Sequence, residues 1–347
     1  MRKLILAIMV LTGILNASIF EKPDFTKVGT SGATFLKINT SARVQGLGGA
    51  FTAVADDIAA LSMNPAGLTN LKKMSIAFNY TKWISDVKYN YLAFGMPVRF
   101  GAIGIQVGYL TMGEMEETTL LEPDGTGFTF DASSAFVGVT YGRSMTDKLS
   151  VGITAKVIRE AIKRNSAVGY AIDLGTYYRT GFKSLRIAMA VLNFGTKMSF
   201  KGPDLDISYV PSEWKDRYNF AGTALPSTFK TTPYNLPLVF RMGIAYDPVN
   251  NVRHRLTTAL DVLHPNDGQE KVLFGMEYTF NRIFSLRVGY KLDPDRLWDE
   301  DEDYTTGLSA GTGFRFRIGK ALVNIDYAYY NNGLLGNNHF VTVGYSF

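Results

Sequence analysis

The C-terminal segment of the chain alternates between large apolar and small or polar residues up to the final Phe347. Its apolar face carries Val341, Val343, Tyr345 and Phe347, and its other face carries Thr342, Gly344 and Ser346. This period of two is typical of a β-strand with one apolar face. The pattern recurs from about residue 74 onward, without a matching set of helices to cover the apolar faces. Lipid can cover them, so the sequence predicts an all-β, antiparallel transmembrane β-barrel. A soluble β-sandwich array is the competing class.

About fourteen segments show the alternation, and a bacterial single-chain barrel requires an even number of strands. Charged residues within them are expected to face the lumen, because a charge facing lipid near the bilayer midplane costs about 2–4 kcal/mol. This requirement fixes the register of each strand. The expected strands are 74–82, 88–97, 100–110, 129–143, 148–159, 167–180, 184–194, 236–247, 253–263, 269–280, 283–292, 305–318, 320–330 and 339–347.

The connections between these segments alternate in length. Even-numbered connections are short, such as Thr146-Asp147 and Gly181-Phe182, whereas several odd-numbered ones are long, such as 111–128 and 195–235. Outer-membrane barrels have short periplasmic turns and longer external loops. The length pattern therefore independently predicts a barrel in the bacterial outer membrane, in contact with outer-membrane lipid. The alternating residues Val343, Tyr345 and Phe347 are the candidate C-terminal signal for the barrel-assembly machinery.

The N-terminus has the pattern of a secretory signal peptide. Arg2 and Lys3 precede a short apolar run, and Leu15-Asn16-Ala17 resembles a cleavage site. The apolar run is too short to cross a bilayer as a helix. We therefore expect a signal peptide at 1–17, cleaved after Ala17, then an N-terminal segment at 18–72 and a barrel at 73–347.

Composition excludes several kinds of function. The chain has no cysteine, which excludes disulfides, thiol catalysis and cysteine-ligated metals. The formal charge of +5 includes two signal-peptide residues, so it gives no indication of a nucleic-acid partner. The histidines at 254, 264 and 339 form neither a Ser-His-Asp order nor a metal-binding pair. We expect no enzyme, and therefore no catalytic residues, cofactor or metal site.

The segment 41–68 does not resemble a strand. It contains a glycine cluster, a run of small residues and an Asn-Pro turn, which together are typical of compact irregular backbone, with a short helix expected near 57–62. Irregular backbone at membrane depth must be surrounded by protein, so we expect 18–72 to form a hatch or plug inside the barrel. The residues that mark this hatch are Arg43, Gly46, Gly48, Gly49, Asp56, Asp57, Asn64, Pro65, Ala66 and Gly67.

This block, together with Asp326-Tyr327-Ala328-Tyr329 and the loop from Gly333 to Asn337, resembles the PorV/PorQ group within the wider FadL-type outer-membrane transporters. The resemblance implies a fourteen-stranded barrel with an N-terminal hatch. For FadL relatives it implies passage of hydrophobic small molecules. For PorV and PorQ it implies a role in type IX secretion, with secreted cargo or surface-attachment proteins as partners. No residue set distinguishes PorV from PorQ here.

Charged residues within the strands allow two interpretations. They could line a polar path or hold the hatch through Asp56 and Asp57, or they could pair with one another across a filled interior. We favour mutual pairing for any single residue, because an isolated buried charge is costly. The selected lumen charges are Arg241, Arg255, Asp261, Glu277, Arg287, Lys291, Arg315 and Asp326.

The long loops carry two further features. Acidic clusters near 114–124 and 293–303 supply oxygen atoms that could bind Ca²⁺, but they lack EF-hand spacing, and a solvated acidic rim is the simpler interpretation. The longest loop is rich in aromatic residues, which favours a partner-docking surface or a lid. Its candidate partner residues are Tyr209, Trp214, Tyr218 and Phe220.

Two functions follow from the sequence. In the first, which we place first on the PorV/PorQ resemblance, the barrel is a docking or shuttle component in protein secretion and surface attachment. In the alternative, it passively transports hydrophobic small molecules across the outer membrane.

Overall fold

A computed structural model describes residues 27–209, 225–293 and 305–347. The expected signal peptide, Trp214, Tyr218 and Phe220 lie outside these residues. The strands are β1 (Ser75–Lys82), β2 (Lys88–Val98), β3 (Gly101–Glu116), β4 (Thr129–Ser144), β5 (Leu149–Ile162), β6 (Asn165–Arg179), β7 (Arg186–Gly195), β8 (Asp206–Tyr209), β9 (Leu225–Thr228), β10 (Val239–Asn250), β11 (His254–Pro265), β12 (Lys271–Phe280), β13 (Phe284–Leu292), β14 (Leu308–Ile318), β15 (Ala321–Asn331) and β16 (Asn337–Ser346).

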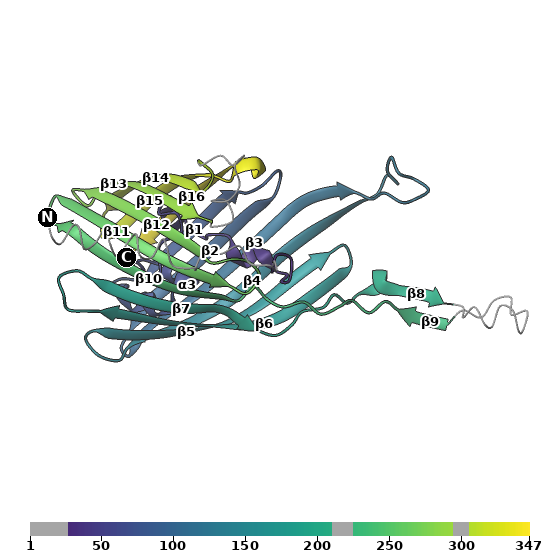
Figure 1. The fold of residues 1–347 in the computed structure, drawn as a ribbon, viewed down its shortest axis with the longest axis horizontal. Helices are drawn as coiled ribbons and strands as arrows, with labels where there is room; N and C mark the ends of the chain where they lie inside the picture. Colours follow the sequence, from purple (N-terminus) through teal and green to yellow (C-terminus); the bar gives the residue numbers. More distant parts are fainter. Residues whose placement is uncertain (1–26, 210–224, 294–304) are drawn as a thin grey trace, which may run out of the picture.

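Fourteen of these strands form one closed antiparallel barrel (Figure 1). Each strand pairs with its neighbour along the chain, and β1 pairs with β16 from Ser75↔Ser346 to Lys82↔His339 to close the barrel. The strands β8 and β9 form a separate hairpin that projects beyond the barrel (Figure 1). The predicted fold class is therefore confirmed, and each predicted strand corresponds to one barrel strand.

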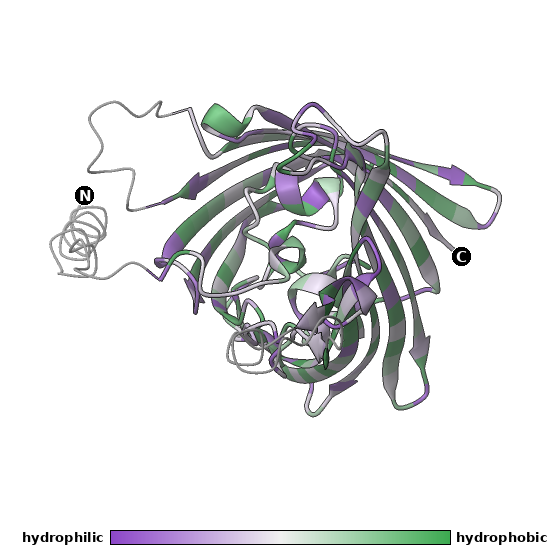
Figure 2. Ribbon diagram, turned by 90° about the vertical axis from the view of Figure 1, so that its right-hand side faces the viewer, coloured by the Kyte–Doolittle hydropathy of each residue, from purple (hydrophilic) through white to green (hydrophobic). Residues whose placement is uncertain are grey.

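Side chains alternate between the lumen and the outer surface. In β1, Ala77, Asn79 and Thr81 are buried, whereas the intervening Ile76, Phe78 and Tyr80 are exposed. The alternation appears as coloured bands along the strands in Figure 2. The outer surface carries large apolar side chains that lipid can cover, and the lumen side carries small and polar ones. The C-terminal Val343, Tyr345 and Phe347 lie on this outer surface.

The connections differ in length at the two ends of the barrel. One end, here called the turn end, carries the six short connections, such as Arg99-Phe100 and Gly319-Lys320. The other, here called the loop end, carries the long ones, including the β8–β9 hairpin, although its β5–β6 connection has only two residues. One predicted boundary was wrong: β3 continues to Glu116 instead of ending at 110. Its pairing with β4 passes a register shift between Thr111 and Glu114, and the polar residues beyond the shift obscure the alternation.

The N-terminal segment lies inside the barrel (Figure 2). It contains the 3₁₀ helices η2 (Thr34–Lys37) and η3 (Pro65–Asn70) and the short α-helices α2 (Ala42–Gly46) and α3 (Ala60–Met63). The hatch expectation is confirmed, and α3 overlaps the helix expected near 57–62. The helix α2 was not predicted. No helix in the described part of the chain is long and apolar enough to cross a membrane.

Candidate functional site: the plug and its contacts with the barrel

The described N-terminal segment, here called the plug (residues 27–74), runs the length of the lumen. At the loop end, Ser31 pairs with Asn235, and Lys37 forms an ion pair with Asp267 at 2.7 Å. At the turn end, η3 packs on β4, β5 and β6. From residue 27 onward, the chain therefore runs through the lumen from the loop end to the turn end before β1 begins.

A buried arginine joins the plug to the wall. The Arg43 guanidinium on α2 donates through Nε and Nη2 to the two oxygens of Glu277 on β12, at 2.8 and 2.7 Å. Its Nη1 donates to Asp56 at 2.5 Å and Asp57 at 2.7 Å, both in the plug. Ser41 caps α2 by accepting from the Arg43 backbone N–H. Because Arg43 is only 5% exposed, these carboxylates replace the water that its charge has lost.

The Arg43 contacts are the centre of a longer ion-pair chain. Towards β15, Arg287 donates to Glu277 at 2.6 Å and to Asp326 at 2.6 Å. Towards β7, the chain continues from the plug through three further wall residues. These are Arg255, which lies 3.3 Å from Asp56, Asp247, which lies 3.3 Å from Arg255, and Arg186, which lies 2.6 Å from Asp247. Positive and negative groups alternate throughout, so each charge has an opposite neighbour.

The electrostatics of the plug agree with this geometry. Burial opposes ionisation of the Asp56 carboxyl, but the neighbouring Arg43 and Arg255 guanidinium groups outweigh burial and hold its pKa below the usual value. Asp56 is therefore a carboxylate at neutral pH, as its two ion pairs require.

A second polar contact holds the middle of the plug. Asp261 on β11 accepts hydrogen bonds from the backbone N–H groups of Phe51 and Thr52 and from the Thr52 hydroxyl. Arg241 on β10 donates to the Gly49 carbonyl at 2.6 Å and lies 3.3 Å from Asp261. These wall side chains satisfy plug backbone groups that would otherwise be buried without partners.

Glycines on the wall allow the plug backbone to approach closely. A Cβ added at Gly289 on β13 would lie 2.0 Å from the Gly48 nitrogen, and one at Gly275 on β12 would lie 2.6 Å from the Leu47 carbonyl oxygen. Gly48 itself has a φ of 64°, a left-handed conformation that favours glycine. The glycine cluster of the plug thus fits against glycines of β12 to β14.

A second glycine contact lies across the lumen. Gly142, Gly152 and Gly175 are directly paired neighbours on β4, β5 and β6. A Cβ at Gly152 would lie 2.3 Å from the carbonyl carbon of Pro65, and one at Gly175 would lie 2.1 Å from Asn64 Oδ1. Asn64 caps η3 by accepting from the Ala66 N–H, and its side-chain amide donates to the carbonyls of Thr52 and Thr176. We call the three wall glycines the glycine row.

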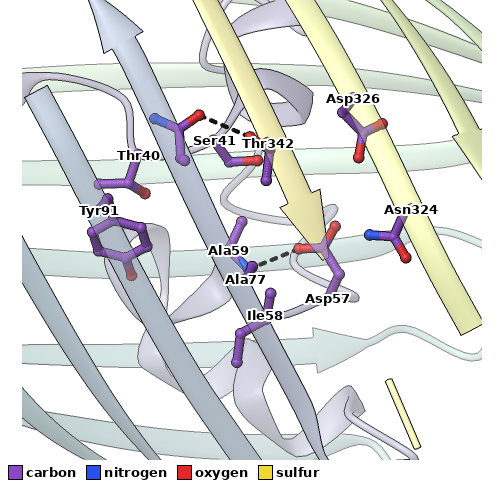
Figure 3. A pocket seen from close by; sticks show the side chains of 11 residues that line it. Thr40, Ser41, Asp57, Ile58, Ala59, Ala77, Tyr91, Asn324, Asp326 and Thr342 are labelled. Atoms are coloured by element: carbon purple, nitrogen blue, oxygen red, sulfur yellow. Dashed lines mark hydrogen bonds between the residues drawn. The ribbon is translucent and has the colours of Figure 1, made fainter. Parts of the chain in front are cut away.

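A water-sized cavity of about 20 Å³ remains between the plug and the first and last strands (Figure 3). Asp57 reaches it from the plug and Asp326 from β15, each already bound to an arginine of the ion-pair chain. The Thr342 hydroxyl on β16 accepts from the Ala42 N–H of the plug and donates to Asn79 on β1. The remaining lining includes Thr40, Ser41, Tyr91 and Asn324.

The structure places most hatch residues in these contacts. Arg43, Asp56 and Asp57 form the ion pairs, the hatch glycines Gly46 and Gly48 face wall glycines, and the Asn64 turn sits on the glycine row. Of the other hatch residues, Gly49 has a positive φ of 86°, and Pro65, Ala66 and Gly67 are buried in η3. Of the partner-loop candidates, the described Tyr209 is exposed at the end of β8.

The selected lumen charges have different environments. Six form ion pairs inside the barrel: Arg241, Arg255, Asp261, Glu277, Arg287 and Asp326. Lys291 is half-buried near the loop end, and Arg315 is exposed at the turn end of β14. Asp247, Arg186 and the wall glycines were not among the residues predicted from the sequence. Their lumen-facing parity was the available signal, but parity alone does not show which plug residue each one meets.

The family model for UPF0164, an uncharacterised protein family, matches residues 16–347. The chain belongs to UPF0164. Among curated proteins, none matches this UPF0164 chain.

Several solved structures share the fold of this UPF0164 chain. The toluene transporter TodX of Pseudomonas putida has a TM-score of 0.55 at 12% identity, and the match covers 94% of this chain and 99% of TodX. The monoaromatic hydrocarbon channel CymD has a TM-score of 0.54 at 12% identity, covering 89% and 97%. The toluene transporter TbuX of Ralstonia pickettii has a TM-score of 0.50 at 12% identity, covering 88% and 97%. At these identities the likeness shows that the chain shares the barrel fold of these proteins and nothing further.

We expect Arg43→Met to destabilise the protein strongly, because Glu277, Asp56 and Asp57 would lose their shared cation inside the lumen. The free energy of unfolding should fall by about 3–5 kcal/mol, as when one partner of a buried ion pair is removed. Urea unfolding in lipid vesicles, followed by the heat-modifiable mobility of the folded barrel, measures the change. Adding Asp57→Asn should recover part of the loss, since Asp57 is the carboxylate whose ion pair within the described residues is with Arg43. Unchanged stability in Arg43→Met would show that the ion pairs of Arg43 do not hold the plug against the wall.

We expect Gly152→Ala to displace the plug, because the new Cβ would collide with the Pro65 backbone. The chain has no cysteine, so an introduced Ala66→Cys is a unique label site at a position that is now fully buried. Maleimide labelling of Cys introduced at 66 should be faster in the Gly152→Ala background. Gly268→Ala is the matched control, since its Cβ would make only an ordinary contact of 3.7 Å. Equal labelling rates in both backgrounds would contradict the close contact.

Proposed function

We propose that this protein is an outer-membrane barrel that transports hydrophobic small molecules and that the plug closes its lumen. Support comes from a cluster of buried apolar side chains on the wall of the loop-end half of the lumen. Its side chains, here called the apolar lumen patch, are Tyr89, Tyr91, Leu110, Phe136, Ile158 and Phe340, all at most 4% exposed. A barrel that conducts hydrated solutes has a polar interior, so this patch favours an apolar ligand.

The side chains that cover the apolar lumen patch in this structure indicate how a ligand would bind. Phe35 of η2 packs on Phe136 with ring centroids 6.2 Å apart, and Ile38 belongs to the same cluster. Met198 and Leu236, from the segments that flank the β8–β9 hairpin, complete the cover. A hydrocarbon entering from the loop end would replace these side chains on the patch, exchanging one apolar contact for another. The FadL-type fold of the hydrocarbon transporters named above supports the same class of ligand.

The proposal also places the chain in the outer membrane, with a signal peptide at 1–17, a hatch at 18–72 and a barrel at 73–347. The length difference between the turns and the loops supports a periplasmic turn end.

Ligand binding can be followed by the fluorescence of Trp83, whose ring packs edge-on against that of Phe340 with the ring centroids 6.3 Å apart. The other two tryptophans, Trp214 and Trp298, would be replaced by Phe so that only Trp83 emits. We expect toluene to change this fluorescence saturably. Leu110→Asp, which places a carboxylate in the patch, should weaken binding by about tenfold or more, because a buried charge disfavours apolar contacts.

Leu110→Met is the matched control and should bind within about threefold of the parent, since its volume and polarity are conserved. Heat-modifiable mobility checks that each variant is folded. The absence of a saturable signal with both toluene and hexadecane would exclude the proposed ligand class at this patch. Equal affinity in Leu110→Asp and the parent would place binding elsewhere.

A second candidate function is docking in PorV/PorQ-like protein secretion, favoured by the β8–β9 hairpin. Tyr209, the last residue of β8, is 50% exposed, and Phe229, which follows β9, is 61% exposed. Exposed aromatic side chains on a projecting hairpin are typical of protein contact sites.

Deleting residues 206–228 tests the docking role. If the hairpin docks a secreted protein, the deletion should abolish co-purification of a protein of defined mass while leaving toluene binding to the apolar lumen patch unchanged. Native mass spectrometry of the detergent-extracted protein gives both readouts. Retention of the same protein partner after the deletion would exclude the hairpin as its docking site.

A further inference from the structure

The turn end of the barrel carries a regular ring of positive charge. Each of the six short connections between β2 and β15 contains one basic residue, whereas all six together contain a single acidic residue, Asp147. The six basic residues, here called the basic ring, are Arg99, Lys148, Lys183, Arg253, Arg282 and Lys320. Because successive turns follow one another around the barrel, the charges surround its whole circumference.

The basic ring is exposed and lacks counter-charges. All six side chains are exposed, and within the described residues none of them forms an ion pair. The pairs that two of them do make are with aromatic rings: Arg99 lies 5.3 Å from the Phe100 ring centroid and Lys183 lies 5.8 Å from that of Phe182. These positive charges are therefore available to an external anion.

Apolar residues accompany the ring on the outer surface. In the turns themselves, Phe100 and Phe182 are each 65% exposed, Val252 is 81% exposed and Ile283 is 53% exposed. Next to them on the strands lie exposed aromatic side chains, namely Tyr141, Tyr178, Phe280, Phe314, Phe316, Tyr345 and Phe347. Such aromatic girdles mark the boundary between the hydrocarbon core and the headgroups. The basic ring lies just beyond this girdle, at headgroup level.

The loop end differs, because charges of both signs lie there. Its described part carries exposed basic residues such as Lys82, Lys88 and Lys197 together with the exposed Glu122 and Asp124, and the connection after β13 is strongly acidic in sequence. The six turn-end connections thus carry nearly unopposed positive charge, beside one leaflet.

We propose that the basic ring binds the anionic headgroups of phospholipids in the leaflet around the turn end. Two features favour lipid over an acidic protein: the charges encircle the barrel instead of forming one patch, and four of the six, Arg99, Lys183, Arg253 and Arg282, are next to an exposed apolar side chain that can enter the membrane. Lysine and arginine near an anionic bilayer surface each contribute favourable electrostatic energy, which weakens as salt screens it. This interaction is independent of the lumen and of what passes through it.

The test measures the selectivity of the lipid shell around the full-length barrel in vesicles. Electron spin resonance compares spin-labelled phosphatidylglycerol with spin-labelled phosphatidylcholine, both present at the same low level in a phosphatidylcholine bilayer. We expect phosphatidylglycerol to be preferred by about threefold at low salt, with the preference falling in 1 M NaCl. A variant with all six ring residues changed to Gln should lose most of this preference.

A matched variant changes six exposed basic residues at the loop end to Gln: Lys82, Lys88, Arg159, Lys197, Lys201 and Lys230. It removes the same charge and should keep the wild-type preference. Equal losses in the two variants would assign the effect to net charge and overturn the proposal. A wild-type barrel without lipid preference that instead binds poly-glutamate through the ring would assign the ring to an acidic protein. Heat-modifiable mobility confirms that both variants are folded.

Discussion

The contact between Arg43 and Glu277 is the interaction on which the arrangement of plug and wall depends. A guanidinium and a carboxylate that are both almost fully buried must find partners within the lumen. Close backbone packing makes the contact attainable, because Gly46, at the other end of the same short helix, lies against the wall at Gly311. A Cβ added at Gly46 or Gly311 would lie only 3.3 or 3.1 Å from the Cα of the other, so a side chain at that contact would crowd α2 against β14. The wall glycines therefore allow close packing of the plug, and the ion-pair chain pairs its buried charges, so that both are needed for the plug to lie inside the barrel.

The lumen is chemically divided along its length. The loop-end half carries the apolar lumen patch, beside which the buried Lys156–Asp173 ion pair lies, whereas the turn-end half is crossed by the ion-pair chain and the Arg241–Asp261 contacts. An apolar molecule would find favourable contacts only in the first half. The second half can admit such a molecule only if the plug moves, since its buried charges exclude hydrocarbon. Binding and release are thus separated in space, with the plug between them.

The sequence predicts the barrel far better than the contacts inside it. Strand alternation and connection length are local, so the strand order, the closure of the barrel and the lumen side of Glu277 and Asp326 could all be inferred. The helix α2 was missed because it has five residues and a single side-chain cap, Ser41. The Arg43–Glu277 contact joins residues 234 positions apart, and nothing in either neighbourhood identifies the other. The glycine row likewise becomes visible only when the register of three strands is known.

The distribution of charge shows how the plug could move without leaving an isolated ion along the ion-pair chain. Arg43 has two carboxylate partners within the plug, Asp56 and Asp57, and both would travel with it. On the wall, Glu277 would keep Arg287 as its partner, and Arg255 would keep Asp247. Separation along the ion-pair chain therefore leaves paired charges on both sides, whereas the Lys37–Asp267 pair at the loop end would break. The wall itself is hydrogen-bonded along both edges of every barrel strand, so it resists opening between strands. Movement of the plug as a unit is consequently the change that this barrel accommodates most readily.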